Sequence, residues 1–278
     1  MGQVIIQSET TLNPISLIGK EAGICWGADT TNEAKNYKRG ADCIKSNHGR
    51  TMEFPDVYMV LDGYSARVIR EFYTHIGGAP TRLQASTRYI DYEHGYEHIV
   101  PTSVSKNPCA TLVYLDAVDR LKDTLRELDD MGIPREDTAM LLPLGMATKV
   151  VVKINARTLM DMSRQRMCTR AYWEYRILFN DICRALCAYS EEWEVFVTDN
   201  FMAKCDACGY CVEARCCGKK PTKEKFFELH NVGKMFTDYL EGKKTFDEVV
   251  DSYSSIVNKL VEDNLLNIAN KIVESEEK

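Results

Sequence analysis

Two short apolar stretches in this sequence have the alternation of a β-strand, and a helical pattern follows each of them directly. The first, "DVYMVLDGYS" (56–65), leads into "ARVIREFY" (66–73), whose apolar residues recur at helical spacing. The second, "KVVVKI" (149–154), leads into a helical pattern over residues 155–189 with a break near Cys168. Elements in this order must bury their apolar faces against each other, which predicts an α/β (α+β) fold.

The rest of the chain indicates one large body with a helical extension. "ATLVYLDAVDRLKDTLRELDDMGI" (110–133) is amphipathic and ends at a glycine followed by a proline, as helices commonly do. Pro221 begins a tail whose residues 223–275 have the pattern of two or three acidic helices. We therefore expect a body over residues 1–220, with a cysteine-rich loop at 205–217, and a helical extension over residues 221–278.

Composition excludes several classes of protein. The chain has 278 residues and a net charge of −6, which disfavours non-specific nucleic-acid binding because that function needs a basic surface. No apolar run approaches the length of a membrane span, and the N-terminus lacks the charged leader and apolar core of a signal peptide. The odd number of cysteines, eleven, indicates reduced thiols. We expect a cytoplasmic protein with neither a membrane nor a nucleic-acid partner.

The segment "THIGGAPTRLQASTRY" (74–89) combines backbone freedom with many hydrogen-bonding groups. Gly77 and Gly78 allow left-handed backbone and a close approach to a flat ligand. If residues 85–90 are extended, the side chains of Gln84, Ser86 and Arg88 point the same way at a period of two. An amide, a hydroxyl and a guanidinium in one row could bind a nucleobase edge and a phosphate.

A second segment is rich in arginine although the protein is acidic. Five arginines and no lysine lie between Arg157 and Arg176, with only two acids among them. Arginine offers a planar fork that binds carboxylates and phosphates bidentately, which lysine does not. Taken alone, the arginine pattern fits a solvated helix face, with Arg157 and Asp161 as a local ion pair, as well as it fits a ligand-binding face.

Motifs in both segments resemble those of the flavin-dependent thymidylate synthase family. The Ser-x-Arg-Tyr ending of that family's signature stands here as Ser86-Thr87-Arg88-Tyr89. Its Asn-Ala-Arg helix opening stands as residues 155–157, and its Arg-x-Cys-x-x-Ala-x-Trp-Glu stretch is matched over residues 166–174. "NHGRTMEF" (47–54) is similar to a further element, Gly-His-x-Ser-x-x-Glu-His. The resemblance covers roughly residues 13–220, with the motifs in the family's order.

The resemblance implies a homotetramer that converts dUMP to dTMP. It implies FAD as cofactor, methylenetetrahydrofolate as one-carbon donor and NADPH as reductant. By position, Arg166 would face the uracil and act in catalysis with Ser86, although Ser86 is a less suitable nucleophile because no histidine adjoins it. The implied dUMP-binding residues are Gln84, Ser86, Arg88, Arg166 and Arg82. The implied FAD-binding residues are Thr74, His75, Ile76, Asn155, Arg157, Asp161 and Phe54.

The chain departs from the family pattern at several of these positions. The family's Arg-His-Arg is Thr74-His75-Ile76, so two charges are missing, and Arg82 could compensate for them. Gln84 occupies the position of a glutamate, and Phe54 keeps an aromatic face where the family has a histidine. A related flavin-dependent (hydroxy)methyltransferase acting on another pyrimidine nucleotide is therefore an alternative, as is a homologue that keeps the fold without the activity.

Five cysteines lie close together in "CDACGYCVEARCC" (205–217). Cys205, Cys208, Cys211 and Cys216 are separated by two, two and four residues, a spacing at which thiolates bind zinc or an iron–sulfur cluster. A structural zinc ion fits better, because the last gap is longer than in bacterial ferredoxins and no proline follows. Free thiols in a cysteine-rich loop are the alternative interpretation. A non-catalytic zinc-knuckle binding protein is accordingly the alternative outside the enzymes.

Overall fold

A computed structural model describes residues 2–78, 80–90, 95–255, 257–259 and 262 of the chain. The contacts within it divide the chain into two compact units, Met1–Lys204 and Cys205–Lys278. The cysteine-rich segment therefore lies in the second unit, whereas the sequence assigned it to the first. Residues 263–278 of the expected helical extension lie outside the described residues.

The first unit is built on a four-stranded antiparallel sheet with the strand order β1-β2-β4-β3. The strands are β1 (Gln3–Ile6), β2 (Asp56–Ser65), β3 (Thr81–Gln84) and β4 (Ala147–Asn155). Alternate residues of the two central strands are buried, Val57, Met59 and Leu61 from β2 and Val150, Val152 and Ile154 from β4. One face of the sheet therefore forms the core, as the alternating sequence predicts.

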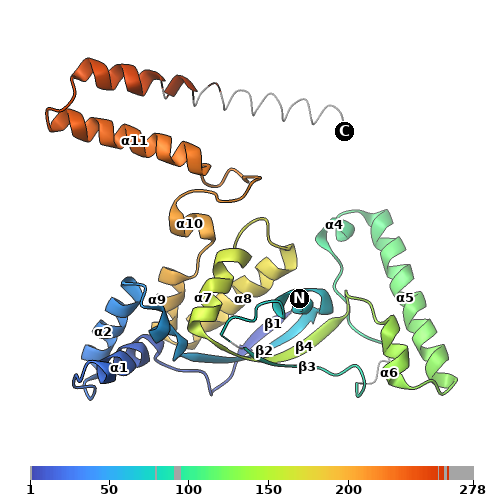
Figure 1. The fold of residues 1–278 in the computed structure, drawn as a ribbon. Helices are drawn as coiled ribbons and strands as arrows, with labels where there is room; N and C mark the ends of the chain where they lie inside the picture. The colour runs from blue at the N-terminus through green and yellow to red at the C-terminus, as the bar shows by residue number, and fades with distance from the viewer. Residues whose placement is uncertain (1, 79, 91–94, 256, 260–261, 263–278) are drawn as a thin grey trace. The chain divides into compact units, whose positions relative to one another are not determined.

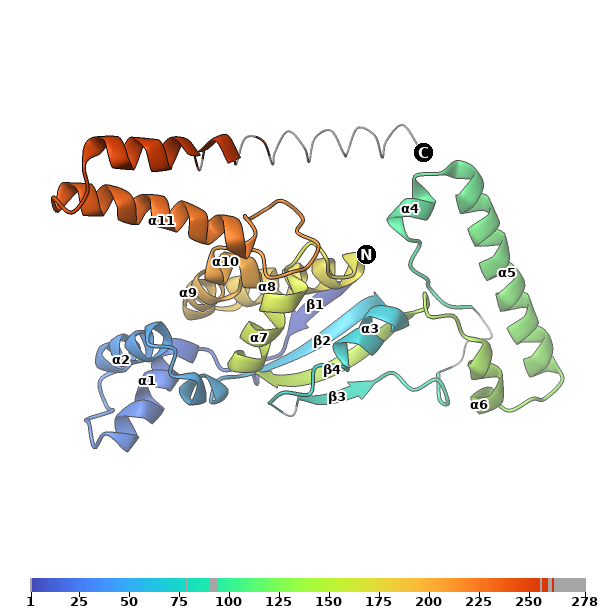
Figure 2. The same cartoon turned by 45° about the horizontal axis from the view of Figure 1, so that its top comes forward.

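Helices that directly follow the central strands pack against this buried face (α7 is labelled in Figure 1 and α3 in Figure 2). Ser65 ends β2 and caps α3 (Ala66–Phe72), while Asn155 ends β4 and caps α7 (Ala156–Arg166). Helices α8 (Trp173–Tyr189) and α9 (Glu191–Asn200) complete the core with fully buried aromatic side chains such as Trp193 and Phe196. Each change from strand to helix takes place at one polar residue whose side chain binds a free backbone N–H group.

The remaining helices of the first unit lie at the two ends of the sheet (Figures 1 and 2). One group holds α1 (Pro14–Cys25), α2 (Glu33–Lys45) and the 3-10 turn η1 (Gly49–Glu53). The other holds α4 (Thr102–Ser105), α5 (Pro108–Asp130), α6 (Arg135–Thr138) and η2 (Ala139–Leu141). In the first group, a Cβ on Gly19 would lie 1.8 Å from a backbone oxygen of α2, so this glycine lets the two helices pack closely.

The second unit contains α10 (Lys204–Cys208, which begins at the boundary) and α11 (Lys223–Leu240). Residues 241–244 form the expected turn, and helix resumes at residues 246–255. In the described part of the chain, no helix is both long enough and apolar enough to span a membrane.

The strands and helices predicted from the central periodicities are confirmed, including the break between α7 and α8. One local prediction is wrong. Residues 85–90 are not extended, because the backbone N–H groups of Tyr89 and Ile90 donate to the Ser86 carbonyl and form a turn. The row expected from Gln84 through Ser86 to Arg88 therefore ends with the strand at Gln84.

Candidate active site

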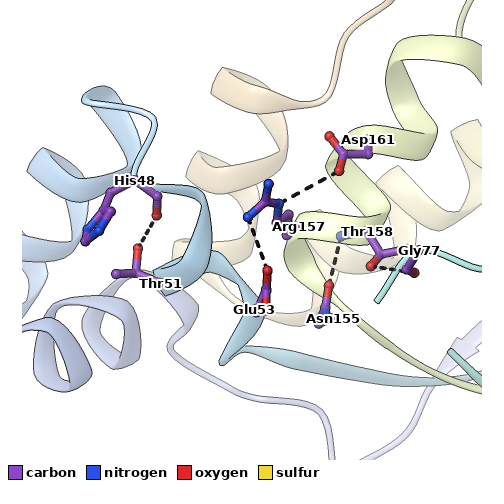
Figure 3. Close-up of polar contacts among 8 residues, drawn as sticks. All are labelled: His48, Thr51, Glu53, Gly77, Asn155, Arg157, Thr158 and Asp161. Carbon is purple, nitrogen blue, oxygen red and sulfur yellow. Dashed lines mark hydrogen bonds and ion pairs between the residues drawn. The ribbon is translucent and has the colours of Figure 1, made fainter. Parts of the chain in front are cut away.

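The start of α7 gathers several of the residues expected to bind the cofactor (Figure 3). The Asn155 side chain accepts a hydrogen bond from the Thr158 backbone N–H at 2.8 Å. Arg157 is 41% exposed, and its guanidinium lies 3.1 Å from the Glu53 carboxylate and 4.0 Å from that of Asp161. The helix N-terminus and a partly exposed guanidinium thus provide donors for an anionic group.

The glycine pair lies against this helix start. The Thr158 hydroxyl donates to the Gly77 carbonyl at 3.1 Å, as Figure 3 shows. Gly78 has a φ of 70°, and a Cβ there would lie 2.1 Å from the Thr158 hydroxyl oxygen and 3.0 Å from Asn155 Nδ2. The close approach expected from the glycine pair is made here to the protein itself, because Gly78 brings the loop onto α7.

Arg166, at the other end of α7, lies in a compact polar group with residues of α3 and α8. Its Nε donates to His75 Nε2 at 2.8 Å, and its Nη1 lies 3.4 Å from the Glu71 carboxylate. The guanidinium stacks 4.3 Å from the ring centroid of Tyr175, which is fully buried. Only 17% of the Arg166 side chain is exposed, so its orientation is fixed by three contacts.

His75 accepts a hydrogen bond from Arg166, which requires an unprotonated Nε2. Burial, followed by the charges of Arg166 and Arg82, lowers the pKa of His75 from 6.5 to about 4. The imidazole is therefore neutral at physiological pH. A neutral ring can hold the Arg166 fork without repelling it.

Since the folded-state pKa of His75 lies below the unfolded value, we expect the protein to lose stability as the pH falls. Between pH 6.5 and about 4 the unfolded chain binds the additional proton, so the contribution of His75 to stability is complete above pH 6.5 and declines below it. His75→Gln, which keeps an acceptor but does not titrate, should show a shallower decline. Denaturant unfolding at pH 7 and pH 5 measures the loss of stability in the wild type and in His75→Gln. An equal loss in the two proteins would contradict the assignment of this pH dependence to His75.

Arg82 joins the Arg166 group from strand β3. Its Nη1 donates to the carbonyls of Phe72 and His75, each at 3.3 Å, and its guanidinium lies 4.5 Å from the Tyr73 ring centroid. The positive charge therefore lies at the C-terminal end of α3, where the helix dipole favours a cation. The structure thus brings together three residues expected at the nucleotide and cofactor sites: Arg82, Arg166 and His75.

The other expected nucleotide-binding residues lie along the end of β3. Gln84 Nε2 lies 3.4 Å from the Thr148 hydroxyl, and a cavity of about 240 Å³ lined by Ala85, Thr148 and Lys149, among others, opens beside them. Ser86 Oγ accepts the Arg88 backbone N–H at 3.3 Å, and the Arg88 guanidinium forms an exposed ion pair with Glu136 at 3.0 Å. Within the described residues of one chain, no hydrogen bond or ion pair joins Ser86 or Arg88 to Arg166.

The residues that replace the family's two arginines supply no charge. The Thr74 hydroxyl donates to the Glu71 carbonyl at 2.6 Å, and the Ile76 side chain is exposed. Phe54 presents an exposed ring close in sequence to Glu53. A flat cofactor could stack on that ring, whereas Thr74 and Ile76 offer it no charged contact.

Two members of the Arg166 group, Glu71 and Tyr175, were not predicted from the sequence. Glu71 precedes His75 by four residues, a spacing that could have indicated a shared face. Tyr175 had no such signal, because only the packing of α8 on α3 and α7 places it under Arg166.

The cysteines of the second unit are only partly brought together. The Cys211 backbone N–H donates to the Pro221 carbonyl at 2.7 Å, which places residues 205–211 beside residues 216–222. The Gly218 N–H donates to Cys216 Sγ at 3.4 Å. Among the described residues, however, no three His, Cys, Asp or Glu side chains form a group able to hold a metal ion. A zinc site at Cys205, Cys208, Cys211 and Cys216 therefore stays a prediction.

Metal analysis of full-length protein purified without chelator tests that prediction. If the four thiols close around an ion, close to one zinc per chain is expected, because a tetrahedral thiolate site holds a single ion tightly. Cys208→Ser should then lose the metal, and Cys25→Ser, at an exposed cysteine of the first unit, should keep it. A content below about 0.2 equivalents would refute the zinc site.

Comparisons with known proteins agree with this architecture. The family model "Thymidylate synthase complementing protein" matches residues 8–189. A flavin-dependent thymidylate synthase of Nitratidesulfovibrio vulgaris is 26% identical over 72% of this chain and 84% of its own length. One of Clostridium tetani is 25% identical over 82% of this chain and 98% of its own length.

A solved structure has the same fold. The flavin-dependent thymidylate synthase of Helicobacter pylori, crystallised with FAD and dUMP, is similar with a TM-score of 0.56 and 19% identity, over 72% of this chain and 99% of that one. The matched family segment contains strands β2, β3 and β4 and helices α1 to α8, which hold all the groups around α7. The chain belongs to the thymidylate synthase complementing protein family.

Proposed function

We propose that this chain is an FAD-dependent thymidylate synthase that converts dUMP to dTMP. Methylenetetrahydrofolate would donate the carbon and NADPH the reducing equivalents. Family membership, relatives named for this activity and a structural neighbour solved with FAD and dUMP support the proposal. The observation that carries it within this chain is the Arg166 group, a guanidinium held by His75, Glu71 and Tyr175.

The residues at the start of α7 fit a dinucleotide cofactor. Asn155 and Arg157 would bind its polar groups, and the exposed Phe54 ring offers a stacking surface. Asp161 would orient Arg157, since the two lie 4.0 Å apart. When bound, FAD supplies the hydride chemistry that no side chain of the protein can perform.

The nucleotide would lie between Arg166 and the end of β3. dUMP is close to a dianion, so Arg88, Ser86 and Arg82 are suited to its phosphate and sugar, and Gln84 to the base edge. Arg166 would donate to a uracil carbonyl and stabilise the negative charge that develops as the ring is activated. Since no hydrogen bond or ion pair joins Arg88 or Ser86 to Arg166 among the described residues of one chain, we propose that the site is completed between chains of a homotetramer.

A product assay tests the proposed function. Purified protein should be yellow, with an absorbance maximum at about 450 nm from oxidised flavin. Given dUMP, isotope-labelled methylenetetrahydrofolate and NADPH, it should produce labelled dTMP. The mass of the product separates the alternatives, because a hydroxymethyl nucleotide or turnover of a cytosine nucleotide would identify a related transferase. Protein that stays colourless with added FAD would exclude both enzymes.

A further inference from the structure

The helices of the second unit form an antiparallel hairpin. A turn joins α11 to a second helix, residues 246–255, and the two lie side by side in Figures 1 and 2. The ring centroids of Phe236 and Tyr253 are 6.0 Å apart, and those of Tyr239 and Phe246 are 5.9 Å apart. Phe236 precedes Tyr239 in α11, whereas their partners come in the reverse order, so the helices run in opposite directions.

One side of this hairpin is apolar and exposed. Phe236 and Leu240 of α11 are four residues apart and form one stripe. Phe246, Val250 and Tyr253 of the second helix form another, at spacings of four and three. The ring contact between Phe236 and Tyr253 joins the stripes into one surface, which we call the hairpin face. Its five side chains are 38% to 82% exposed, and exposed apolar surface of this kind marks a contact site.

The two ends of the hairpin carry opposite charge. The open end, where α11 begins, holds five lysines and two acids: Lys219, Lys220, Lys223, Lys225 and Lys259, with Glu224 and Glu228. The turn end holds five acids and two lysines: Asp238, Glu241, Asp247, Glu248 and Asp251, with Lys243 and Lys244. Lysines at the start of a helix oppose its dipole, so their charge does not stabilise α11 itself. The charge of the hairpin is therefore suited to a partner that is acidic at one end and basic at the other.

A second copy of the hairpin has this pattern in one orientation. A two-fold axis parallel to the hairpin face and perpendicular to the helices lays two hairpins antiparallel, with each open end over the turn end of the other. The two hairpin faces then meet and make a bundle of four helices. An axis along the helices would instead bring like ends together, where like charges repel.

We propose that the hairpin face binds the hairpin of a second copy of this chain in that antiparallel orientation. Burial of the five apolar side chains stabilises the contact, and the charges of the two ends select its direction. The hairpin lies outside the matched family segment, residues 8–189, so the proposal does not depend on the activity proposed above. It gives the helical extension a role, which is to join two chains through a contact separate from the first unit.

Carbodiimide crosslinking of the full-length protein, read by peptide mass spectrometry, tests the contact. This reagent adds no spacer, so it joins a lysine to a carboxylate only where the two touch. Lys223 and Asp247 lie at opposite ends of one hairpin, about 25 Å apart along α11, so a crosslink between them forms only between copies. We expect it in the wild type. The ion pair of Lys259 and Glu228, at 3.3 Å within one chain, is the internal control.

Val250→Asp places a charge within the hairpin face. The yield of the interchain crosslink should fall at least about 10-fold, because an unpaired carboxylate is costly to bury. Asn231→Asp is the matched control, since Asn231 is exposed and, five residues before Phe236, lies toward the other side of α11. Its yield should equal that of the wild type. The crosslink between Lys259 and Glu228 should persist in both variants, which shows that the hairpin is intact.

Charge reversal tests the orientation. Asp247→Lys with Asp251→Lys makes both ends of the hairpin basic, and Lys223→Asp with Lys225→Asp makes both ends acidic. Each double variant alone should give little interchain crosslink between the ends of its hairpins. A mixture of the two, with one isotope-labelled, should give crosslinks that join the labelled to the unlabelled chain, because each basic end then meets an acidic one.

The proposal fails if the wild type gives the crosslink between Lys259 and Glu228 but none between Lys223 and Asp247. It also fails if Val250→Asp gives the wild-type yield, or if Asp247 crosslinks instead to lysines of residues 1–204, which would show that the first unit covers the hairpin face. Failure of the proposed function is seen separately: wild-type protein that makes no dTMP but gives the interchain crosslink refutes the activity and keeps the docking surface.

Discussion

Arg166→Ala is expected to lower kcat/KM for dUMP at least about 30-fold, which corresponds to about 2 kcal/mol of lost transition-state stabilisation. The wild-type guanidinium is oriented by His75, Glu71 and the Tyr175 ring, so little entropy is lost when it donates to the substrate. The kcat/KM of Arg166→Lys should lie between those of the wild type and Arg166→Ala. An ammonium keeps the charge but cannot bind His75 and the substrate with one planar fork. Steady-state kinetics with dUMP as the varied substrate measures both variants.

Arg164→Ala is the control for this prediction, since Arg164 lies in the same last turn of α7. It should retain kinetics within about twofold of the wild type, as a change outside the site normally does. Arg88→Ala should resemble Arg166→Ala, with a comparable loss of about 2 kcal/mol for a lost phosphate contact. Unchanged kinetics in both Arg166→Ala and Arg88→Ala would exclude the proposed nucleotide site.

The central part of the fold could be predicted from sequence because its signals are local. Strand β2 and helix α3 meet at Ser65, and β4 and α7 meet at Asn155, so the period changes at a residue that caps the helix. The two edge strands carried no comparable signal. Strands β1 and β3 have four residues each, too few for an alternation to be distinguished from a loop.

The candidate site could be predicted only where one segment carries the information. Asn155, Arg157 and Arg166 were predicted from short motifs that resemble those of the family, and all three lie at the cap or within α7. Their partners could not be predicted in this way. Glu136 lies beside Arg88, and Tyr175 beside Arg166, only because the fold brings separate segments together. The turn at Ser86 was missed because its carbonyl accepts two backbone N–H groups, a choice that propensity does not reveal.

Glu174→Ala is expected to lower the free energy of unfolding by about 3 kcal/mol. Glu174 is only 4% exposed, and its carboxylate accepts the Ser65 backbone N–H at 2.7 Å and the Ser65 hydroxyl at 2.5 Å. Alanine leaves both buried donors without an acceptor and separates the first turn of α8 from the start of α3. Glu174→Gln keeps one acceptor and should cost less, about 1–2 kcal/mol.

The same carboxylate links stability to the candidate site. Ser65 caps α3, and α3 carries Glu71, one of the three groups that hold Arg166. Glu174→Ala should therefore also raise KM for dUMP, although Glu174 itself is buried and its hydrogen bonds go to Ser65. Glu194→Gln is the matched control, because Glu194 also occupies a first helical turn, that of α9, but is exposed. Glu194→Gln should change the free energy of unfolding by less than about 0.5 kcal/mol in the same denaturant titration. An equal loss of stability in Glu174→Ala and Glu194→Gln would show that the contact between Glu174 and Ser65 contributes nothing.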